Sequence, residues 1–452
     1  MEPRILERAE HPVSRANIDH NVLRVLYRLI GAGHIAYLVG GSVRDLMLGR
    51  HPKDFDVATS AHPQQVRDLF RNSRLIGRRF RLVHVFFGRQ NVEVATFRRQ
   101  TGQIEPGDDP LIRHDNTFGT PEEDAFRRDF TVNALFYDPE TFRVIDYAGG
   151  VSDLEARLIR TIGEPELRVR EDPVRMMRAV RFAAKLEFEI EPATRAAIER
   201  HRNDLLKSSV PRLVEETYKT LGQVEGATAI LLMEQLGLLE PLLPWLSEHL
   251  KRHKDSLEQS PTVRGMAALG RASREGFGSG RSVVLATMFL DYWRAKSNGS
   301  ASERIDLLSA LRLRGFARAD TEHMRLLIEA FEHLAKPSRR TRRLTRRPYF
   351  AEARRWFDLI APVYEIDREP SARFLADPDK FFATYGAQAG EQRRSRRRRR
   401  RRRRGSQGAG IDHPASGNHA APVHHHGHDS TAQNRAEPAV HTHPAPHPGR
   451  RD

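Results

Sequence analysis

The chain has 452 residues, no cysteine and a formal net charge of +16 at pH 7. The absence of cysteine excludes disulfide-stabilised scaffolds, cysteine-ligated zinc and thiol catalysis. At about 150 residues per domain, this length predicts about three domains. No apolar run approaches the ~18 residues of a membrane-spanning helix, and the first residues contain no hydrophobic signal segment. We therefore expect a cytoplasmic protein without a membrane partner.

Much of the positive charge is concentrated near the C-terminus. Between Arg393 and Arg404 the sequence has eleven arginines and one serine. Residues 386–452 contain almost no large apolar side chains, so they are predicted to form a disordered basic tail. The run is compatible with a nuclear-localisation-like address, a membrane-surface tether, simple repetition or non-specific contact with nucleic-acid phosphates, for which Arg396 and Arg400 are the candidate residues. The histidine-rich segment 424–428 indicates either a solvated low-complexity segment or a transition-metal site.

Helical and strand-like patterns are mixed near the N-terminus. Residues 1–20 are polar and predict a loose arm, and NVLRVLYRLIGAG at 21–33 has helical spacing that ends in glycine. AYLVGG at 36–41 predicts a short buried strand that enters a glycine turn, and that turn opens a helix at 42–49. A loop and a strand follow in HPKDFDVATS at 51–60, and a short helix is expected at 62–72.

The remainder of the chain changes from mixed to helical character. Strands are expected at 80–88, 92–98 and 142–147, a mobile loop at 101–123 and a helix that begins near Asp129. After Ser152 only helical spacing is found. We therefore predict an α+β fold with an N-terminal arm and helix (1–33), a mixed-sheet head with helices (34–150), an all-α neck (151–222), an all-α body (223–385) and the tail (386–452).

Two aspartates in the run Lys53-Asp54-Phe55-Asp56-Val57 are the strongest local signal. On the predicted strand, Asp54 and Asp56 point to the same face. Like charges side by side are unfavourable unless they are neutralised, and two carboxylates together with substrate phosphates suit Mg²⁺. The alternative is that both aspartates are solvated in a loop, which is the more common situation for an isolated Asp-x-Asp sequence.

A glycine turn lies shortly before these aspartates. Gly40 and Gly41 allow the backbone to approach a ligand closely. The helix that follows, together with Arg44, offers a site for an anion such as a triphosphate. The alternative is a plain strand-to-helix turn, but its position before the aspartate pair favours an anion-binding site.

Four motifs in this order resemble the polymerase-β-type nucleotidyltransferase superfamily. They are GGSVRD (40–45), DFDVAT (54–59), RRDFTVNAL (127–135) and EDPVRMMRAVRFAAKL (171–186). The resemblance is to the branch that bacterial poly(A) polymerases share with class II CCA-adding enzymes, and it covers roughly residues 34–220. It implies a head domain that transfers a nucleoside monophosphate from a triphosphate to an RNA 3′-hydroxyl.

The resemblance assigns expected roles in the head. Asp54 and Asp56 are expected to hold the ions of a two-metal Mg²⁺ site. A third carboxylate is expected, with Asp129 as the first choice and Glu93 as its rival. Gly40, Gly41 and Arg44 are expected to bind the nucleotide, and so are Arg128 and Asn133.

The fourth motif is expected to recognise the base. Asp172 followed by proline predicts the N-cap of a helix. By resemblance, Glu171, Asp172 and Arg175 form the protein template that reads the incoming base, and Arg178 supports it or contacts phosphate. The alternative is an ordinary amphipathic helix with solvated arginines.

The segment GRRFRLVHV at 77–85 resembles the poly(A) polymerase version of the family, and Arg78 and Arg79 are candidate RNA-binding residues. We therefore predict an adenylyltransferase that uses ATP and Mg²⁺ to extend RNA 3′ ends without a template. The alternatives are a CCA-adding enzyme for transfer RNA and a catalytically inactive RNA-binding protein that retains the fold.

Overall fold

The computed structural model describes residues 2–77, 82–99, 118–278, 280–296 and 301–384. The chain divides into two compact units, Met1–Phe382 and Ala383–Asp452, and the elements below belong to the first. The predicted tail and residues 101–117 of the predicted loop at 101–123 lie outside the described residues, and so do four predicted RNA-binding residues, Arg78, Arg79, Arg396 and Arg400. The end of that loop prediction is wrong, because a helix begins at Pro121.

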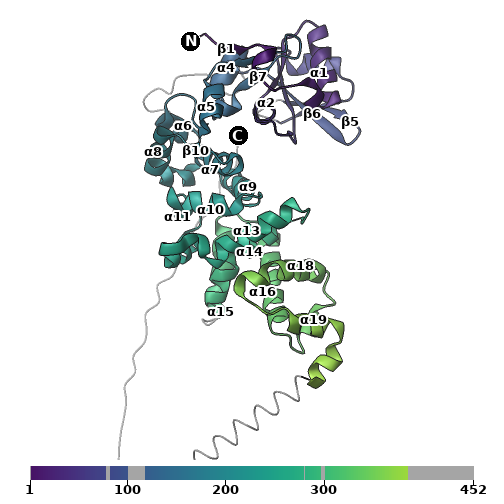
Figure 1. Cartoon of the computed structure of the whole chain (residues 1–452), viewed down its shortest axis with the longest axis vertical. Helices are drawn as coiled ribbons and strands as arrows, with labels where there is room; N and C mark the ends of the chain where they lie inside the picture. Colours follow the sequence, from purple (N-terminus) through teal and green to yellow (C-terminus); the bar gives the residue numbers. More distant parts are fainter. Residues whose placement is uncertain (1, 78–81, 100–117, 279, 297–300, 385–452) are drawn as a thin grey trace, which may run out of the picture. The chain divides into compact units, whose positions relative to one another are not determined.

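An eight-stranded mixed sheet forms the N-terminal part, which is drawn in purple and blue in Figure 1. Its spatial order is β1-β8-β7-β2-β3-β6-β5-β4. Only β3 and β6 pair in parallel among neighbouring strands of this sheet. The strands are β1 (Arg4–Leu6), β2 (Ala36–Val39), β3 (Asp56–Thr59), β4 (Ser73–Ile76), β5 (Leu82–Phe87), β6 (Gln90–Thr96), β7 (Leu135–Tyr137) and β8 (Val144–Asp146).

Alternation along the central strands builds a core on both faces of the sheet. Leu38 and Val57 belong to the main core, whereas Val39 and Ala58 belong to a smaller cluster with Phe136. Because successive strand side chains point to opposite faces, this pattern places the middle strands between two apolar layers. The helices of this part are α1 (His20–Gly31), α2 (Gly41–Met47), α3 (Pro63–Leu69), α4 (Pro121–Phe126) and α5 (Gly150–Ala156), with 3-10 turns η1 (Arg8–Glu10), η2 (Arg15–Asn17) and η3 (Thr131–Asn133).

Two sequence-based expectations for this part are wrong. The N-terminal residues are not only a loose arm, because Arg4–Leu6 forms β1 and pairs antiparallel with β8. The segment after Asp129 is not a helix, because η3 leads directly into β7. The residues of β7 are fully buried, and a strand buried on both faces has a continuous apolar run that a helical pattern can also fit.

The rest of the described chain is helical, apart from a two-residue parallel ribbon of β9 (Leu158–Ile159) and β10 (Glu189–Ile190). This ribbon was not expected, whereas the predicted helical character is confirmed. The helices are α6 (Pro165–Glu171), α7 (Val174–Leu186), α8 (Pro192–His201), α9 (Val210–Leu221), α10 (Gly226–Gln235), α11 (Leu239–Leu242), α12 (Pro244–Leu250), α13 (Pro261–Arg274), α14 (Arg281–Lys296), α15 (Ala301–Leu313), α16 (Arg318–Ala335), α17 (Thr341–Leu344), α18 (Phe350–Ile360) and α19 (Glu369–Ala376), with 3-10 segments η4 (Arg202–Lys207), η5 (Lys251–Gln259) and η6 (Ala361–Tyr364).

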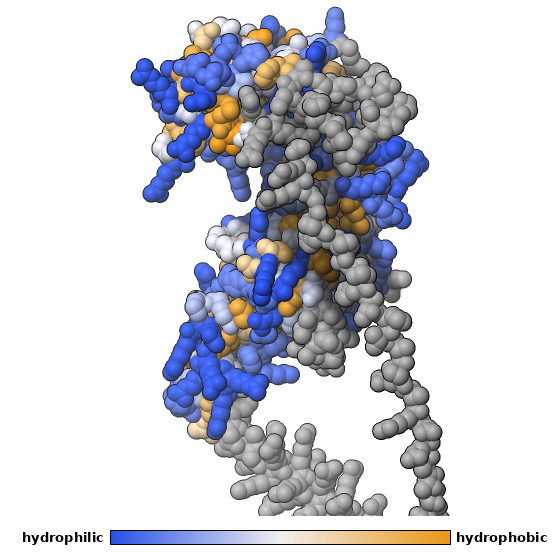
Figure 2. All heavy atoms as spheres, turned by 180° about the vertical axis from the view of Figure 1, so that it is seen from behind, coloured by the Kyte–Doolittle hydropathy of each residue, from blue (hydrophilic) through white to orange (hydrophobic). Residues whose placement is uncertain are grey.

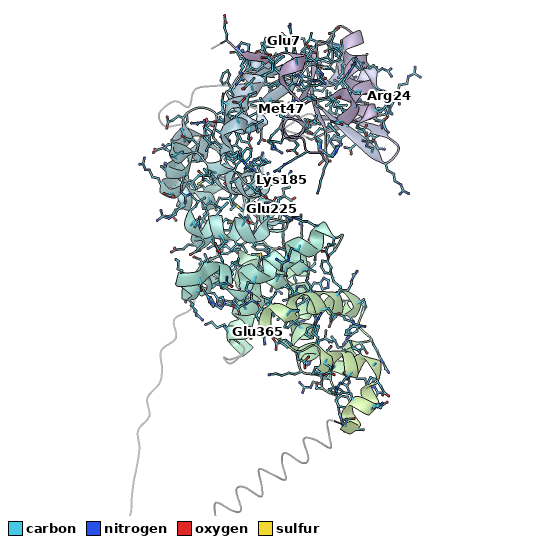
Figure 3. All side chains as sticks on the ribbon, viewed as in Figure 1. Glu7, Arg24, Met47, Lys185, Glu225 and Glu365 are labelled. Atoms are coloured by element: carbon cyan, nitrogen blue, oxygen red, sulfur yellow. The ribbon has the colours of Figure 1, made fainter. Side chains whose placement is uncertain are left out.

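Helix α7 connects the mixed sheet with the helical region. Phe182 packs its ring edge-on against Phe130, with the ring centroids 5.8 Å apart. At the end of α7, the Arg50 guanidinium donates hydrogen bonds to the carbonyl oxygens of Lys185 and Leu186 (Lys185 is labelled in Figure 3). The motif that begins at Glu171 is thereby held against the head by both apolar and polar contacts.

The surface of the described residues is largely polar. On the face drawn in Figure 2, hydrophilic side chains cover most of the coloured surface, with hydrophobic residues visible between them. Among the described residues, no helix combines the length and hydropathy needed to cross a bilayer.

Candidate active site

A cavity of about 870 Å³ opens where β2, β3 and β6 meet α7 and α9. Five acidic and nine basic side chains line it, so a cationic surface surrounds a small group of carboxylates. All the described residues that were predicted to bind metal or nucleotide line this cavity, except the buried Glu171. They are Gly40, Gly41, Arg44, Asp54, Asp56, Glu93, Arg128, Asp129, Asn133, Asp172, Arg175 and Arg178.

Asp56 and Glu93 lie side by side on two neighbouring central strands of the sheet. Asp56 is the first residue of β3 and is in parallel register with Glu93 on β6. Asp54 precedes β3, so the prediction that both aspartates lie within the strand is wrong, although both line the cavity. Burial and the neighbouring charges of Glu93 and Asp54 raise the pKa of Asp56 to about 6, against the opposing effect of Arg128. This excess of negative charge favours a bound cation.

His84 on β5 approaches Glu93 from the next strand. Its Nε2 lies 3.5 Å from Glu93 Oε2, and the two residues are directly opposite in the antiparallel β5–β6 pair. His84 Nδ1 also lies 3.1 Å from Asn91 Nδ2. The ring therefore orients the Glu93 carboxylate from the side opposite to Asp56.

The glycine turn lies close to the Arg128 guanidinium, so a side chain at position 40 would displace it. Gly40 has a φ of 72°, and a Cβ atom there would lie 2.9 Å from Arg128 Nη1. Val39, which precedes the turn, pairs with Asp56, so the C-terminal end of β2 with its glycine turn lies beside the start of β3. The backbone angle therefore favours glycine at position 40, and its small size leaves Arg128 in place.

Arg44 lines the cavity, but its guanidinium already has protein partners. Its Nε and Nη2 donate to Asp45 Oδ1 at 2.8 and 2.6 Å, and its Nη1 donates to Asn133 Oδ1 at 2.5 Å. The side chain is almost fully buried. In this structure Arg44 therefore holds Asn133 and Asp45 in place from the cavity wall, and its predicted contact with the nucleotide stays a prediction.

Asp124 holds two consecutive arginines in place. Its Oδ1 accepts from Arg127 Nη2 at 2.6 Å and its Oδ2 accepts from Arg128 Nη2 at 2.8 Å. Burial raises the pKa of Asp124, but Arg128 and Arg127 more than offset this effect, so the pKa is lowered. The ionised carboxylate thus positions both guanidinium groups at the cavity wall.

Asp129 is bound by protein side chains. Its Oδ2 accepts from Arg178 Nε at 2.7 Å, and its Oδ1 accepts from Asn133 Nδ2 at 3.2 Å. Burial raises the pKa of Asp129, but the charge and hydrogen bonds of Arg178 lower it to about 2. The carboxylate is therefore ionised and neutralised by an arginine, which sets it apart from Asp56 and Glu93.

The predicted base-reading residues form two ion-paired groups. Glu171 is buried, and its Oε2 accepts from Arg168 Nη1 at 2.9 Å and Arg175 Nη1 at 3.1 Å. Asp172 Oδ2 accepts from Arg212 Nη2 on α9 at 2.7 Å. Asp172 makes no side-chain cap on α7, so that expectation is wrong. Asp172 and Arg175 line the cavity, whereas Glu171 supports Arg175 from behind.

Sequence reasoning missed several residues of this site, namely Asp124, Arg168, Arg212 and Lys219. Arg212 pairs with a residue 40 positions away, and Arg168 donates to the carbonyl oxygens of Arg127 and Arg128 at 3.0 and 2.6 Å. Such long-range partners leave no local sequence signal. Asp124 was detectable, because it precedes Arg127 and Arg128 at helical i,i+3 and i,i+4 spacing.

Two regions of this chain match known protein families. Residues 36–160 match the family described as "Poly A polymerase head domain", and residues 187–250 match "Probable RNA and SrmB- binding site of polymerase A". Poly(A) polymerase I of Salmonella typhi is 50% identical over 261 residues, which is 56% of this chain and 56% of that protein. The CCA-adding enzyme of Lactobacillus helveticus is 44% identical over 195 residues, or 43% of this chain and 48% of that protein. The chain thus spans about half the length of these curated relatives.

Solved structures share the fold. The Bacillus stearothermophilus CCA-adding enzyme in complex with CTP has a TM-score of 0.59 and 26% identity, and the match covers 80% of this chain and 82% of that chain. The matched head-domain region contains strands β2 to β8 of the sheet and most of the residues that line the cavity. In sequence the chain is similar to bacterial poly(A) polymerases and CCA-adding enzymes, and its fold is similar to that of a CCA-adding enzyme.

Proposed function

We propose that this protein adds AMP from ATP to RNA 3′ ends without a template. The observation that carries this proposal is the group of Asp54, Asp56 and Glu93 in the wall of a cavity that eight arginines and a lysine also line. Carboxylates of this kind suit divalent cations, and the surrounding guanidinium groups suit a triphosphate. A protein that had lost catalysis would have no need to retain the unfavourable cluster of acidic groups.

Asp54, Asp56 and Glu93 would hold Mg²⁺, which would lower the pKa of the attacking hydroxyl and neutralise charge on the triphosphate. Their oxygen donors fit this ion, and the raised pKa of Asp56 is consistent with carboxylates placed close together for a cation. Between the two candidates for the third carboxylate, the geometry favours Glu93. Asp129 is already neutralised by Arg178 and Asn133.

The chain's own residues would bind and orient the nucleotide. The turn at Gly40 and Gly41 lets the phosphates approach the backbone, with Arg128 beside them. Arg178 has its side chain one-third exposed toward the cavity and can contact phosphate or sugar while it holds Asp129. Asp172 and Arg175 would present an acceptor and donors to the edge of the base.

RNA is the proposed acceptor. The region that matches the RNA-binding description, residues 187–250, begins directly after α7 and therefore follows the base-reading residues in the chain. A tRNA nucleotidyltransferase crystallised with a primer tRNA and an incoming ATP analog shares the fold, with a TM-score of 0.51 and 21% identity. We also retain the sequence-based prediction of a cytoplasmic location.

Poly(A) addition is favoured over CCA addition by the extent of the sequence match. Poly(A) polymerase I from Haemophilus influenzae is 43% identical over 272 residues, whereas the match to the Lactobacillus helveticus CCA-adding enzyme covers 195 residues. The CCA-adding alternative rests on the solved structures, because the Bacillus stearothermophilus enzyme was crystallised with CTP.

Extension of a labelled RNA with each nucleoside triphosphate alone tests the proposal. The wild-type protein is expected to extend a generic RNA with ATP, and the Asp54→Asn, Asp56→Asn double variant is expected to bind the RNA without extending it. Extension by the double variant would contradict the assignment of the metal-binding residues. Incorporation of CTP in preference to ATP would instead support CCA addition.

A further inference from the structure

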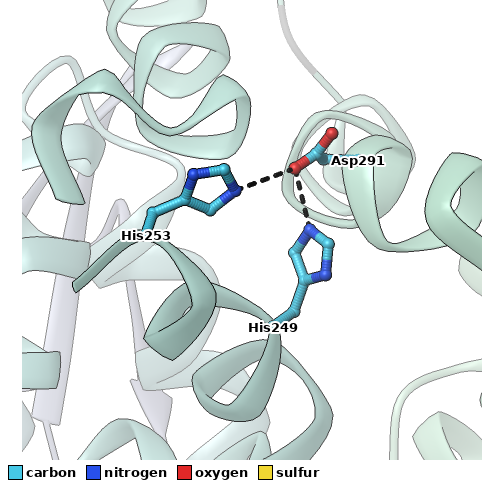
Figure 4. A group of neighbouring side chains, drawn as sticks. All are labelled: His249, His253 and Asp291. Atoms are coloured by element: carbon cyan, nitrogen blue, oxygen red, sulfur yellow. Dashed lines mark hydrogen bonds and ion pairs between the residues drawn. The ribbon is translucent and has the colours of Figure 1, made fainter. Parts of the chain in front are cut away.

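Two histidines and one aspartate converge in the helical region, and none of them lines the candidate active site (Figure 4). His249 lies on α12, His253 in η5 and Asp291 on α14. His249 Nε2 lies 2.8 Å from Asp291 Oδ2, and His253 Nε2 lies 4.0 Å from the same oxygen. We propose that these three side chains bind one transition-metal ion, with zinc as the best match, and thereby hold α12 and η5 against α14.

The donor set distinguishes this group from the carboxylates of the head. Two imidazole nitrogens and one carboxylate oxygen are ligands that zinc accepts, with a water completing four-coordination. Magnesium prefers oxygen donors alone, so the two sites select different ions. Because the chain has no cysteine, histidine and carboxylate are its strongest zinc ligands.

The distances are close to those that a bound ion requires. Bonds of about 2.0–2.2 Å in a tetrahedral arrangement place neighbouring donor atoms about 3.4 Å apart. The three donor atoms all lie within 4.8 Å of one another. The 2.8 Å separation of His249 Nε2 and Asp291 Oδ2 would have to widen slightly. The 4.0 Å separation of His253 Nε2 from the same oxygen would have to shorten, which a rotation of the His253 ring can provide.

His253 is placed to make that adjustment. Its side chain is 38% exposed, whereas the His249 side chain is only 5% exposed and is held between α12 and Tyr292. The backbone at His253 leaves helical geometry, with φ −105° and ψ 34°. A metal bond at His253 would fix the chain at this kink, while His249 and Asp291 supply the preformed part of the site.

The charge of Asp291 also favours a cation here. Among the described side chains, its ion pairs are with His249 and His253, and no lysine or arginine is paired with it. A divalent ion bound by these three side chains would neutralise the Asp291 carboxylate.

Metal binding by the full-length chain tests this proposal. The metal-free protein is titrated with Zn²⁺ and Co²⁺, and bound equivalents and the Tm are measured for wild type, His253→Gln and Asp291→Asn. His323→Gln is the matched control, because His323 Nε2 lies 3.0 Å from Glu352 Oε2 in a histidine–carboxylate pair that has no second histidine. Metal bound by the histidines at 424–428 is common to all four proteins and cancels in the comparison.

Wild type and His323→Gln are expected to bind one more equivalent of metal than His253→Gln and Asp291→Asn do. Binding of that equivalent should raise the Tm of wild type and of His323→Gln only. The remaining affinity at the altered site should be at least about tenfold weaker. Without metal, His253→Gln is expected to have the wild-type Tm, because the His253 side chain is partly exposed. The comparison of wild type with His253→Gln therefore tests the proposal even if Asp291→Asn does not fold. Equal stoichiometry and an equal gain in Tm in wild type and His253→Gln would overturn the proposal.

Discussion

Arg178 and Asp129 form an ion pair between helix α7 and the segment that precedes η3, with Arg178 Nη2 2.5 Å from Asp129 Oδ2. The two residues are 49 positions apart in the chain. This contact fixes the arginine at the cavity and at the same time neutralises a carboxylate that the sequence had offered as a metal ligand. The ion pair therefore joins α7, which carries the proposed base-reading residues, to the head, which carries the proposed metal-binding residues.

Replacement of Asp129 by Asn should destabilise the fold at neutral pH. The pKa of Asp129 falls from 3.8 to about 2 on folding. A depressed carboxyl pKa contributes stability that is present above about pH 4 and is lost as the pH falls toward 2. We expect Asp129→Asn to lower the free energy of unfolding by about 2 kcal/mol at pH 7 and to reduce its pH dependence between pH 4 and 2. Urea unfolding at several pH values measures both effects.

The matched comparison for this prediction is Glu199→Gln, which breaks the exposed pair of Arg195 and Glu199 on α8. Exposed ion pairs contribute little, so this variant should unfold close to wild type. If Asp129→Asn and Glu199→Gln have the same stability at pH 7, the ion pair with Arg178 does not have the role assigned to it.

The affinity for Mg²⁺ should rise as the pH increases through about 6. Asp56 has its pKa raised to about 6 by burial and by its acidic neighbours, so protons compete with the ion below that pH. Glu93→Gln removes one of these acidic neighbours, so the pH at which Mg²⁺-dependent extension reaches half of its maximum should fall. The substitution also removes a proposed ligand, so the affinity for Mg²⁺ at pH 8 should be lower. Mg²⁺-dependent RNA extension measured from pH 5 to pH 8 reports both changes. A midpoint that is unchanged in Glu93→Gln would contradict the placement of Glu93 beside Asp56.

Gly40→Ala should reduce RNA extension at least about tenfold, because the new Cβ atom would meet Arg128 Nη1 at 2.9 Å. Gly49→Ala is the matched control, since Gly49 also has a positive φ, of 67°, but nothing lies within 4 Å of a Cβ atom there. Each substitution should cost about 1–2 kcal/mol through the backbone angle alone. Equal activity of the two variants would show that the approach to Arg128 is unimportant.

Glu171→Gln should relax the choice between nucleotides. The substitution keeps the size of the side chain but removes the charge that Glu171 shares with Arg168 and Arg175. Because Arg175 would then be held less firmly, we expect the preference for ATP over CTP to fall by about tenfold. Single-nucleotide incorporation rates measure this ratio.

Glu216→Gln is the control for that experiment. Glu216 is also buried and also holds an arginine that lines the cavity, with Arg181 Nε 2.6 Å from Glu216 Oε1. Arg181 has no assigned contact with the base, so Glu216→Gln should retain the wild-type preference. A loss of preference in both variants, or in neither, would argue against Glu171 as the support of the base-reading arginine.

The sequence predicted those parts of the site that are local in the chain. The glycine turn before α2 and the aspartates around the start of β3 are short motifs with a direct chemical meaning, and the structure brings them together at one cavity. The change from a mixed sheet to helices was also predictable, because strand and helix periodicity differ. β1 was missed because three residues with one buried side chain carry no alternation that can be recognised.

The choice between Asp129 and Glu93 required the tertiary structure. Both are acidic residues near the predicted core, and only strand pairing places Glu93 opposite Asp56. Arg178 and Arg212 reach carboxylates that are 49 and 40 residues away, so no local pattern could assign those partners. The sequence alone therefore did not predict the residues that position the functional side chains through long-range ion pairs and hydrogen bonds.

Competition between nucleotides tests the central claim most directly. Wild-type protein is incubated with equal concentrations of ATP and CTP and with Mg²⁺, on a generic RNA and on a transfer RNA that lacks its 3′ terminus, and the added nucleotides are sequenced. We predict runs of adenylate on the generic RNA that are absent with the Asp54→Asn, Asp56→Asn double variant. Addition confined to the transfer RNA, with two cytidylates before one adenylate, would contradict the assignment as an adenylyltransferase.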